Sequence, residues 1–364
     1  MKVYLGSKKN FYKANLHCHT RYSDGRASRE DVKREYLSRG YSAVAFTDHE
    51  HTINASELTD ENFVAINGCE LSVHGRKLDT DSPRPSGVVT HMCFLAKDPS
   101  NDLTPCYSEK YDFYKFDDVR HLVKREGDYQ RSHTPEGINE MIRIAHEKGF
   151  LVSYNHPAWS LENSCEYLNY DGFDFVEVHN TGCEKTGHPT EELVYHEMLK
   201  AGKKIKCIAT DDSHNIFGFD HVRSDSFGGW VMINADELSY ASLIEGLESG
   251  DFYASTGPEL YSITLGDDLT VTATFEKGMR RAVILTQGRR VAPCYEVEEG
   301  EAVFKLHPSD ISFRIRIDDS EGHSAYSQQY DLPEDVRATL RERAEAELEA
   351  KRKEAEAKAA EKKD

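Results

Sequence analysis

The chain has 364 residues, of which 38% are hydrophobic and 10% aromatic, and its formal net charge is −19. This length has room for one large domain and a smaller second one, because single hydrophobic cores stop growing near about 250 to 300 residues. The acidic balance argues against binding of extended nucleic acid, and no apolar run approaches the roughly 20 residues that span a bilayer. We therefore expect a soluble globular protein with a small-molecule partner and no membrane partner, whereas the oligomeric state stays unknown.

The first residues and the cysteines indicate a cellular compartment. The opening segment MKVYLGSKKNFYKANLHCHT lacks the apolar core and small-residue cleavage site of a secretory signal. The eight cysteines are scattered, with no CxxC pair. We therefore expect reduced thiols and a cytoplasmic location. Cys18, Cys69 and Cys93 lie beside or near residues of metal-ligand type, and we interpret them as core residues rather than ligands.

From residue 15 onward, short apolar segments alternate with amphipathic ones, a pattern typical of an α/β domain with a mainly parallel sheet or barrel. Each apolar segment is predicted to be a buried strand that ends in polar or ionisable residues. These segments are AVAFTDH (43–49), FVAINGCEL (63–71), VTHMCFLA (89–96), FLVSYNHP (150–157), FDFVEVHN (173–180) and KCIATDDSH (206–214). Because a barrel gathers the carboxyl ends of its strands at one mouth, we expect a site there.

Three segments between or after these strands predict helices. The first two, 28–40 and 134–149, begin with the capping residues Ser28 and Thr134 and end at Gly40 and Gly149. The third, 236–250, has clear amphipathic spacing. The Tyr-rich and charged stretch 98–131 has weak periodicity, so we interpret it as an insertion that forms part of a lid or a substrate wall.

The pattern changes after this third helix. Segments such as LTVTATFE, RAVILTQG and SFRIRIDD alternate with turns and predict a small antiparallel β domain. The last segment is dominated by Ala, Glu, Lys and Arg and predicts a solvated helix. We therefore predict a main domain over 1–261, a β-rich domain over 262–332 and a charged helical tail over 333–364.

Metal-ligand residue types recur at the predicted strand ends. In the pairs His17/His19 and Asp212/His214, the period of two in an extended chain directs both side chains to the same side. Imidazoles and carboxylates in this number are the ligands that Zn, Mn or Fe accept. The candidate metal ligands are His17, His19, Asp24, His49, Glu70, His91, His156, Asp212 and His214.

In this order, the motifs HCH (17–19), SDG (23–25), TDH (47–49) and DDSH (211–214), with Glu70, His91 and His156 between them, resemble the PHP (polymerase and histidinol phosphatase) family of metal-dependent phosphoesterases. The resemblance covers about residues 14 to 215. It implies a distorted seven-stranded (β/α) barrel. It also implies a trinuclear centre of zinc, manganese or iron, with two to three divalent ions bound. The stretch ESGDFYASTGPEL beside the β domain looks like the CehA/McbA branch, which includes carbamate and amide hydrolases.

The same resemblance divides the ligands among the ions. It implies one ion between His17, His19, Glu70 and Asp212, and a second between Asp24, His49 and His214. Glu70 would then bridge to a third ion held with His91 and His156.

Several neighbouring residues have open roles. Asp48 either orients His49 or caps a strand end, and Asp212 is preferred to Asp211 because its register pairs it with His214. Glu177 is a candidate to face the metals. The residues assigned to catalysis are Asp24, His49, Glu70, Asp212, His179 as a substrate contact or general acid, and Arg21 as a phosphate-binding group.

Three functions follow from these residues. The favoured one is hydrolysis of a small phosphomonoester, a nucleotide or a short oligonucleotide by a metal-bound hydroxide, because no Ser or Cys nucleophile is evident. The same centre is also compatible with hydrolysis of a carbamate or an amide. A noncatalytic metal-binding scaffold is the third possibility.

Overall fold

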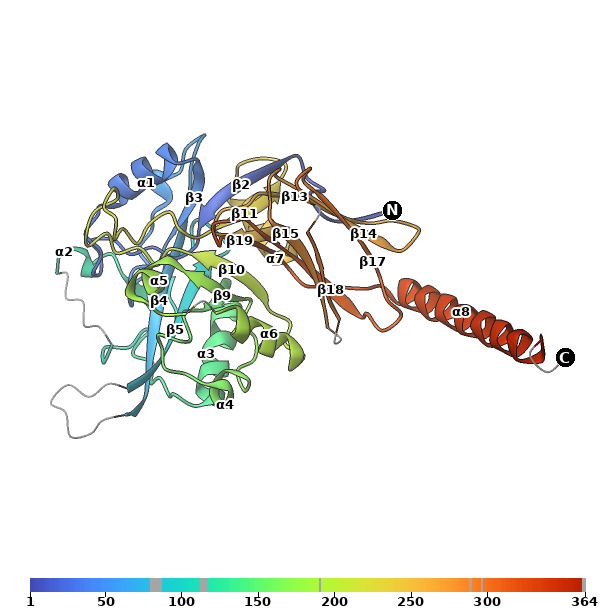
Figure 1. The fold of residues 1–364 in the computed structure, drawn as a ribbon. Helices are drawn as coiled ribbons and strands as arrows, with labels where there is room; N and C mark the ends of the chain where they lie inside the picture. The colour runs from blue at the N-terminus through green and yellow to red at the C-terminus, as the bar shows by residue number, and fades with distance from the viewer. Residues whose placement is uncertain (79–86, 112–116, 190, 288–289, 296, 362–364) are drawn as a thin grey trace. The chain divides into compact units, whose positions relative to one another are not determined.

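The computed structural model describes residues 1–78, 87–111, 117–189, 191–287, 290–295 and 297–361 (Figure 1). The chain divides into two compact units. The larger unit comprises Gly6–Gly257 and His323–Gln328, and the smaller unit comprises Met1–Leu5, Pro258–Gly322 and Gln329–Asp364. The domain limits expected from the sequence stay a prediction.

The larger unit carries most of the helices of the chain. Its elements in chain order are β2 (Asn10–Asn15), α1 (Arg29–Ser38), β3 (Tyr41–Phe46), η1 (Ser56–Leu58), β4 (Val64–Lys77), β5 (Gly87–Ala96), β6 (Leu103–Thr104), α2 (Asp117–Arg120), β7 (Lys124–Arg125), α3 (Pro135–Glu147), β8 (Phe150–Tyr154), α4 (Ser164–Tyr167), β9 (Phe175–Asn180), α5 (Thr181–Thr186), α6 (Glu192–Lys200), β10 (Lys206–Thr210), β11 (Trp230–Ala235), α7 (Tyr240–Ser249), β12 (Phe252–Ser255) and β19 (Ser324–Ser327). None of the described helices of the chain is both long and apolar enough to span a bilayer.

The sheet of the larger unit has the order β10-β9-β8-β5-β4-β3-β2-β11-β12-β19. The pairs β2–β3, β3–β4, β8–β9 and β9–β10 are parallel, as the alternating pattern predicts. The expectation of a mainly parallel sheet is wrong: β12 is antiparallel to β11 and β19, β11 is antiparallel to β2, and β5 is antiparallel to both β4 and β8. For β5, the physical reason is the short connection from β4, because a parallel crossover needs a dozen or more residues.

The predicted helix boundaries agree with the local capping chemistry. The side chain of Ser28 accepts a hydrogen bond from Asp31 N at the start of α1, and that of Thr134 accepts one from Gly137 N at the start of α3. Gly40 and Gly149 follow these helices with φ of +77° and +82°, a conformation that glycine adopts without strain. Helix α1 packs on β3, α3 on β8 and α6 on β9, and Figure 1 shows α1 beside β3.

Backbone hydrogen bonds join the segment after β10, the strand at one edge of this sheet, to the segment after β2. The amide of Asp212 donates to the carbonyl of His17 at 3.0 Å, and the amide of His19 donates to that of Ser213 at 2.9 Å. Cys18 and Ser213 form an isolated parallel bridge. The strand pairing of the described residues does not close into a barrel, so the seven-stranded barrel stays a prediction.

The smaller unit is built from antiparallel strands, as expected for its sequence, and the helical tail. One sheet has the order β1-β13-β14-β17, whereas β15 pairs with β16 and β18, and β18 pairs with β20. These elements are β1 (Lys2–Leu5), β13 (Leu260–Leu265), β14 (Thr270–Phe275), β15 (Arg281–Thr286), β16 (Val291–Cys294), β17 (Glu301–Lys305), β18 (Ser312–Asp318), β20 (Tyr330–Asp331) and α8 (Glu334–Glu361).

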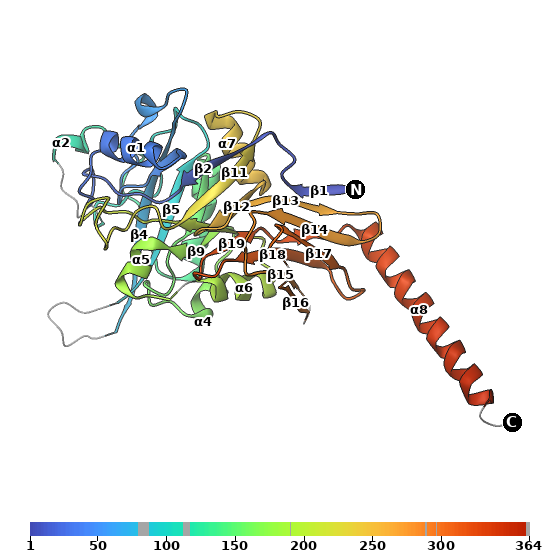
Figure 2. The same cartoon turned by 45° about the horizontal axis from the view of Figure 1, so that its top comes forward.

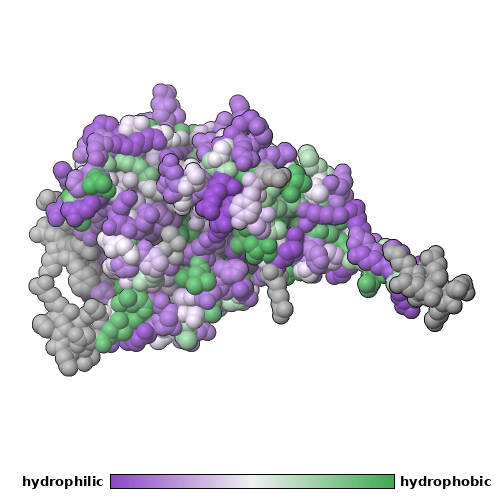
Figure 3. Space-filling model, in the orientation of Figure 1, coloured by the Kyte–Doolittle hydropathy of each residue, from purple (hydrophilic) through white to green (hydrophobic). Residues whose placement is uncertain are grey.

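Helix α8 is the predicted charged tail, drawn in red in Figure 2. Its side chains are exposed from Glu345 to Glu356. The face of the molecule drawn in Figure 3 is mostly hydrophilic, and its hydrophobic residues lie in separate patches. Such scattered apolar residues are ordinary on protein surfaces.

Candidate metal centre

The candidate ligands come from segments far apart in the sequence. His17 and His19 follow β2, His49 follows β3, His156 follows β8, and Asp212 and His214 follow β10. Glu70 and His91 instead lie within β4 and β5, so the expectation that the ligand residues lie at strand ends is wrong for these two. Strands β4 and β5 form a long antiparallel pair in which Ser72 lies opposite His91. Residues in the middle of these two strands, and not only at their ends, therefore contribute to the site.

One group comprises His17, His19, Glu70 and Asp212, whose ligand atoms all lie within 4.8 Å of one another. The Nε2 atoms of the two histidines are 3.1 Å apart. Asp212 Oδ1 lies 3.2 Å from His17 Nε2 and 3.1 Å from His19 Nε2. All four side chains are buried or nearly so.

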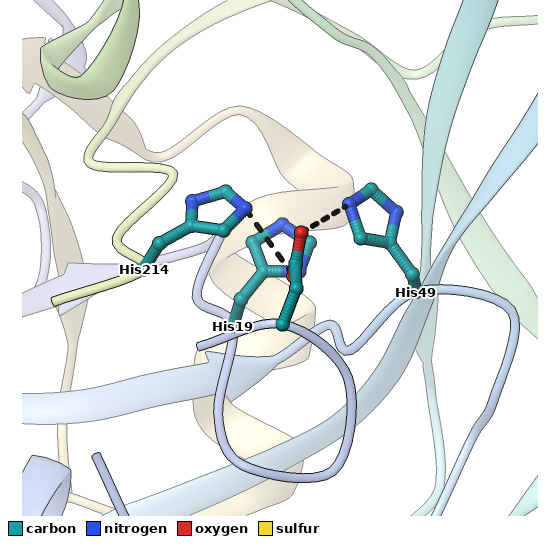
Figure 4. A group of neighbouring side chains, drawn as sticks. His19, His49 and His214 are labelled. Carbon is teal, nitrogen blue, oxygen red and sulfur yellow. Dashed lines mark ion pairs between the residues drawn. The ribbon is translucent and has the colours of Figure 1, made fainter. Parts of the chain in front are cut away.

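A second group comprises His19, Asp24, His49 and His214 (Figure 4). The figure shows the three imidazoles converging from separate segments, and its dashed lines mark the ion pairs. Asp24 Oδ1 lies 3.4 Å from His214 Nε2, and Asp24 Oδ2 lies 3.7 Å from His49 Nε2. His19 therefore belongs to both groups.

A third group comprises Glu70, His91 and His156. Glu70 Oε1 lies 3.2 Å from both His91 Nδ1 and His156 Nε2. The other nitrogen of His91, Nε2, is 3.1 Å from the hydroxyl of Ser72. Since Glu70 is also part of the first group, the three groups form one continuous cluster.

The donor atoms fit divalent ions. Ligand atoms about 2.1 Å from a tetrahedral ion lie about 3.4 Å apart, close to the 3.1 to 3.3 Å that separate His17 Nε2 and His19 Nε2 from their carboxylate neighbours. The buried atoms Asp212 Oδ1 and His91 Nδ1 make no hydrogen bond of acceptable geometry. Buried polar atoms are normally paired, so these two have unused capacity to bind a ligand.

The charges of the cluster are balanced internally. Burial alone would raise the pKa of Glu70 and of Asp212, but His91 and His17 are among the imidazoles that outweigh burial and hold both pKa values well below the usual range. For His17, burial lowers the pKa, but Asp212 and the other nearby acids raise it well above its ordinary value. The carboxylates are therefore ionised, which is the form that binds a metal.

Glu177 orients His17 rather than joining a ligand group. Its Oε1 accepts hydrogen bonds from His17 Nδ1 at 2.7 Å and Thr210 Oγ1 at 2.6 Å. Its Oε2 accepts from His156 N and Asn180 Nδ2, both at 2.9 Å. Because an ionised carboxylate only accepts, His17 Nδ1 carries a proton, and Nε2 is the nitrogen that faces the cluster and would bind an ion through its lone pair once it is deprotonated.

Two other acids hold the loops of the site. Asp48 accepts from Thr20 N at 2.7 Å and from Ser23 Oγ at 2.9 Å, which fixes the turn that carries Asp24. Asp211 accepts from the amides of 227–229 and the hydroxyl of Tyr36. The structure thus places Asp212, not Asp211, among the potential ligands.

Two residues that the sequence associates with catalysis lie apart from this cluster. Arg21 is exposed and donates to the carbonyl of Arg26 at 2.8 Å. His179 is buried, and its Nε2 is 3.2 Å from Thr181 Oγ1. Neither lines the cavity described next, and their proposed roles stay predictions.

The three groups open into a cavity of about 730 Å³. Besides the ligand candidates, its walls include Trp159, Phe217, Lys185 and Arg223. Single aromatic and basic residues outside periodic segments carry no local signal, so these four could not be identified from the sequence. The fold brings these four side chains to the cavity.

A buried cluster of His, Asp and Glu able to hold metal ions, at the strand ends of an α/β sheet, defines a metal-binding α/β protein. The PHP domain family model matches residues 15–207, more than half of the chain. The chain belongs to the PHP domain family.

Bacterial proteins of known structure match this chain at low identity. A two-domain protein from Bacteroides vulgatus, described as containing a predicted PHP-like metal-dependent phosphoesterase, is 13% identical with a TM-score of 0.41, covering 91% of this chain and 98% of that chain. A candidate metal-dependent phosphoesterase from Bifidobacterium adolescentis is 20% identical, with a TM-score of 0.34 and coverage of 55% and 87%. An amidohydrolase from Chromobacterium violaceum with bound sulfate and no metal is 15% identical, with a TM-score of 0.36 and coverage of 55% and 87%. A search among curated proteins finds no match.

Proposed function

We propose that the larger unit is a metal-dependent phosphoesterase that hydrolyses a small phosphomonoester, a nucleotide or a short oligonucleotide. The observation that carries this proposal is that His19 and Glu70 each belong to two of the three ligand groups, and that members of all three groups line one cavity. Shared ligands hold neighbouring ions close enough to contact the same substrate group, which is the arrangement that phosphoryl transfer uses.

The residues have distinct roles in this proposal. His17, His19, Glu70 and Asp212 would hold one ion, Asp24, His49 and His214 would hold a second with His19 beside them, and His91 and His156 would hold a third with Glu70. Zinc, manganese and iron all fit these donors. When bound, the ions supply an activated water near neutral pH and neutralise the charge of the phosphate.

The residues around the candidate ligands orient them and set the charge of the cavity. Glu177 fixes the ring of His17, and Asp48 fixes the turn before Asp24, so that the ligands are arranged before substrate binds. Lys185 and Arg223 add positive charge to a cavity lined by acids, which favours an anionic substrate.

The first test is elemental analysis of protein purified without added metal, together with phosphate release from a panel of nucleotides and sugar phosphates. We expect two to three ions per chain and turnover that is lost in His49→Ala. His307→Ala, an exposed histidine of the smaller unit, is the matched control and keeps both properties. Absence of metal from the wild-type protein refutes the proposal.

The same panel separates the competing functions. Metal-rich protein that releases no phosphate but cleaves aryl carbamates or amides would establish the alternative hydrolase and the CehA/McbA branch. Metal-rich protein inactive on all of these substrates would establish a metal-binding scaffold.

A further inference from the structure

Trp159 is a large aromatic side chain on the wall of the cavity. It is one of two tryptophans in the chain, and 41% of it is exposed. Its ring lies against two imidazoles of the third ligand group, with centroid distances of 5.1 Å to His91 and 5.0 Å to His156. The indole therefore borders the candidate metal centre directly, while a large part of its surface remains open.

The backbone around Trp159 is held in place on both sides. The amide of Ala158 donates to the buried carboxylate of Glu191 at 2.6 Å, and the amide of Ser160 donates to the carbonyl of His156 at 3.1 Å. The carbonyl of Ser160 accepts from Val89 N at 3.1 Å. A ring on such an anchored turn presents a fixed surface, so little conformational entropy is lost when a ligand packs on it.

A second apolar surface lies on the same cavity, on the loop after His214. Ile216 and Phe217 are 59% and 45% exposed. The guanidinium of Arg223 stacks on the Phe217 ring at 3.7 Å. Asp225 accepts from His214 N at 2.9 Å and fixes the start of the loop.

These surfaces favour one kind of substrate. Stacking of an aromatic ligand on an aromatic side chain contributes about 1 to 3 kcal/mol, which corresponds to roughly 5- to 150-fold in affinity. A glycerol phosphate would leave the indole without a flat apolar partner. The cavity thus combines a site for a charged group with a flat apolar wall beside it.

We propose that Trp159 is a specificity-determining residue and selects substrates that carry an aromatic group next to the group held at the metal centre. This inference rests on the proposed function for the identity of the charged group, a phosphate. It adds the chemistry of the neighbouring group, and it assigns that choice to a residue that binds no metal.

Binding can be measured without turnover, using phosphonates that cannot be hydrolysed. Isothermal titration of the metal-loaded protein with phenylphosphonate, cyclohexylphosphonate and methylphosphonate compares ligands of equal charge. We expect phenylphosphonate to bind at least tenfold more tightly than methylphosphonate and at least threefold more tightly than cyclohexylphosphonate. In Trp159→Ala the first ratio falls below threefold, whereas Trp159→Phe keeps most of it.

Trp230→Phe provides the matched control and a spectroscopic reporter, since Trp159 is then the sole tryptophan. Trp230 contacts Lys13 and Tyr41 and does not line the cavity. This variant keeps the binding ratios of the wild type, and its fluorescence changes with phenylphosphonate but not with saturating methylphosphonate. A tenfold preference that persists in Trp159→Ala, or equal binding of all three phosphonates to the wild type, overturns the inference.

Failure of the two proposals is distinguishable. If no phosphoester is hydrolysed but the preference for the phenyl ligand depends on Trp159, the phosphoesterase function is refuted and the role of Trp159 is supported. If phenyl and methyl phosphate are hydrolysed with equal kcat/KM and both phosphonates bind equally, the function stands and the inference is refuted.

Discussion

Replacement of Glu177 by glutamine tests how the site orients its ligands. All four groups that face the carboxylate are donors: His17 Nδ1, Thr210 Oγ1, His156 N and Asn180 Nδ2. An amide has one oxygen and one NH₂ group, so either orientation in Glu177→Gln sets an N–H against two donors. If the NH₂ group faces His17, the imidazole proton moves to Nε2, the atom that faces the other ligand candidates.

The expected magnitude follows from these contacts. Burial alone would raise the pKa of Glu177, but His17 and its hydrogen bond outweigh burial and keep the pKa below its usual value, so the group is a carboxylate at neutral pH. Loss of a hydrogen-bonding partner behind a metal ligand costs 10- to 100-fold in metal affinity, or about 1.4 to 2.7 kcal/mol. Because hydrogen bonds to a charged group contribute about 1.5 to 3 kcal/mol each, we also expect the free energy of unfolding to fall by about 3 kcal/mol or more.

The assay is competition for zinc between the metal-free protein and a chromophoric chelator, with folding followed by circular dichroism. Glu191→Gln is the matched control, because Glu191 is also buried but its side chain accepts from one donor, Ala158 N, which an amide oxygen can still satisfy. Zinc affinity of folded Glu177→Gln within threefold of the wild type would falsify the reasoning.

Three further predictions concern stability. Burial raises the pKa of Glu191 to about 7. The neutral carboxyl is therefore favoured in the folded state, and the free energy of unfolding of the wild type falls as pH rises from about 4.5 through 7. Measured by thermal unfolding, the stability of Glu191→Gln relative to the wild type should increase by up to about 3 kcal/mol between pH 5 and pH 8. A difference that does not change with pH contradicts this. Arg131 and Glu50 form a buried ion pair at 2.7 Å, so Arg131→Met should lower the free energy of unfolding, measured in urea, by about 3 to 5 kcal/mol. Adding Glu50→Gln should restore part of this loss, because it removes the buried charge that Arg131→Met leaves unpaired. A double variant that is no more stable than Arg131→Met contradicts this explanation. Removal of bound metal by a chelator should lower the melting temperature by about 5 to 10 °C, because ions that bind the folded state alone stabilise it by about 2.7 kcal/mol at a hundredfold excess over Kd; an unchanged melting temperature contradicts metal binding.

Local signals in the sequence were sufficient for much of the fold. Ser28 and Thr134 each act through a hydrogen bond to an amide three residues later, so the helix starts follow from neighbours in the chain. The HCH and DDSH motifs likewise direct their histidines by the period of a strand. The candidate ligands could therefore be named, and the structure brings them together in three groups.

The remaining features depend on contacts that short segments do not encode. The antiparallel direction of β5 depends on how the chain returns after β4, which the apolar pattern of either strand leaves open. The four hydrogen bonds of the Glu177 carboxylate and the ion pair of Glu50 with Arg131 each connect residues from different loops and strands. Nothing in the sequence around Trp159 distinguishes it from other aromatic residues in turns, and only the fold places it against His91 and His156.

The hydrogen bonds between the segments after β2 and β10 also constrain the order of assembly. Cys18 and Ser213, whose side chains form a hydrogen bond between these two segments, are 195 residues apart in the chain. Contacts of such long range form late and slowly, because a large loop must close before they contribute. A nascent chain that has emerged only as far as β9 holds His17, His19, Glu70 and His156 but lacks the segment that completes two of the three ligand groups. If the three groups bind ions as proposed, complete metal loading would require the segment after β10 to be in place, and it would then report that the larger unit has folded.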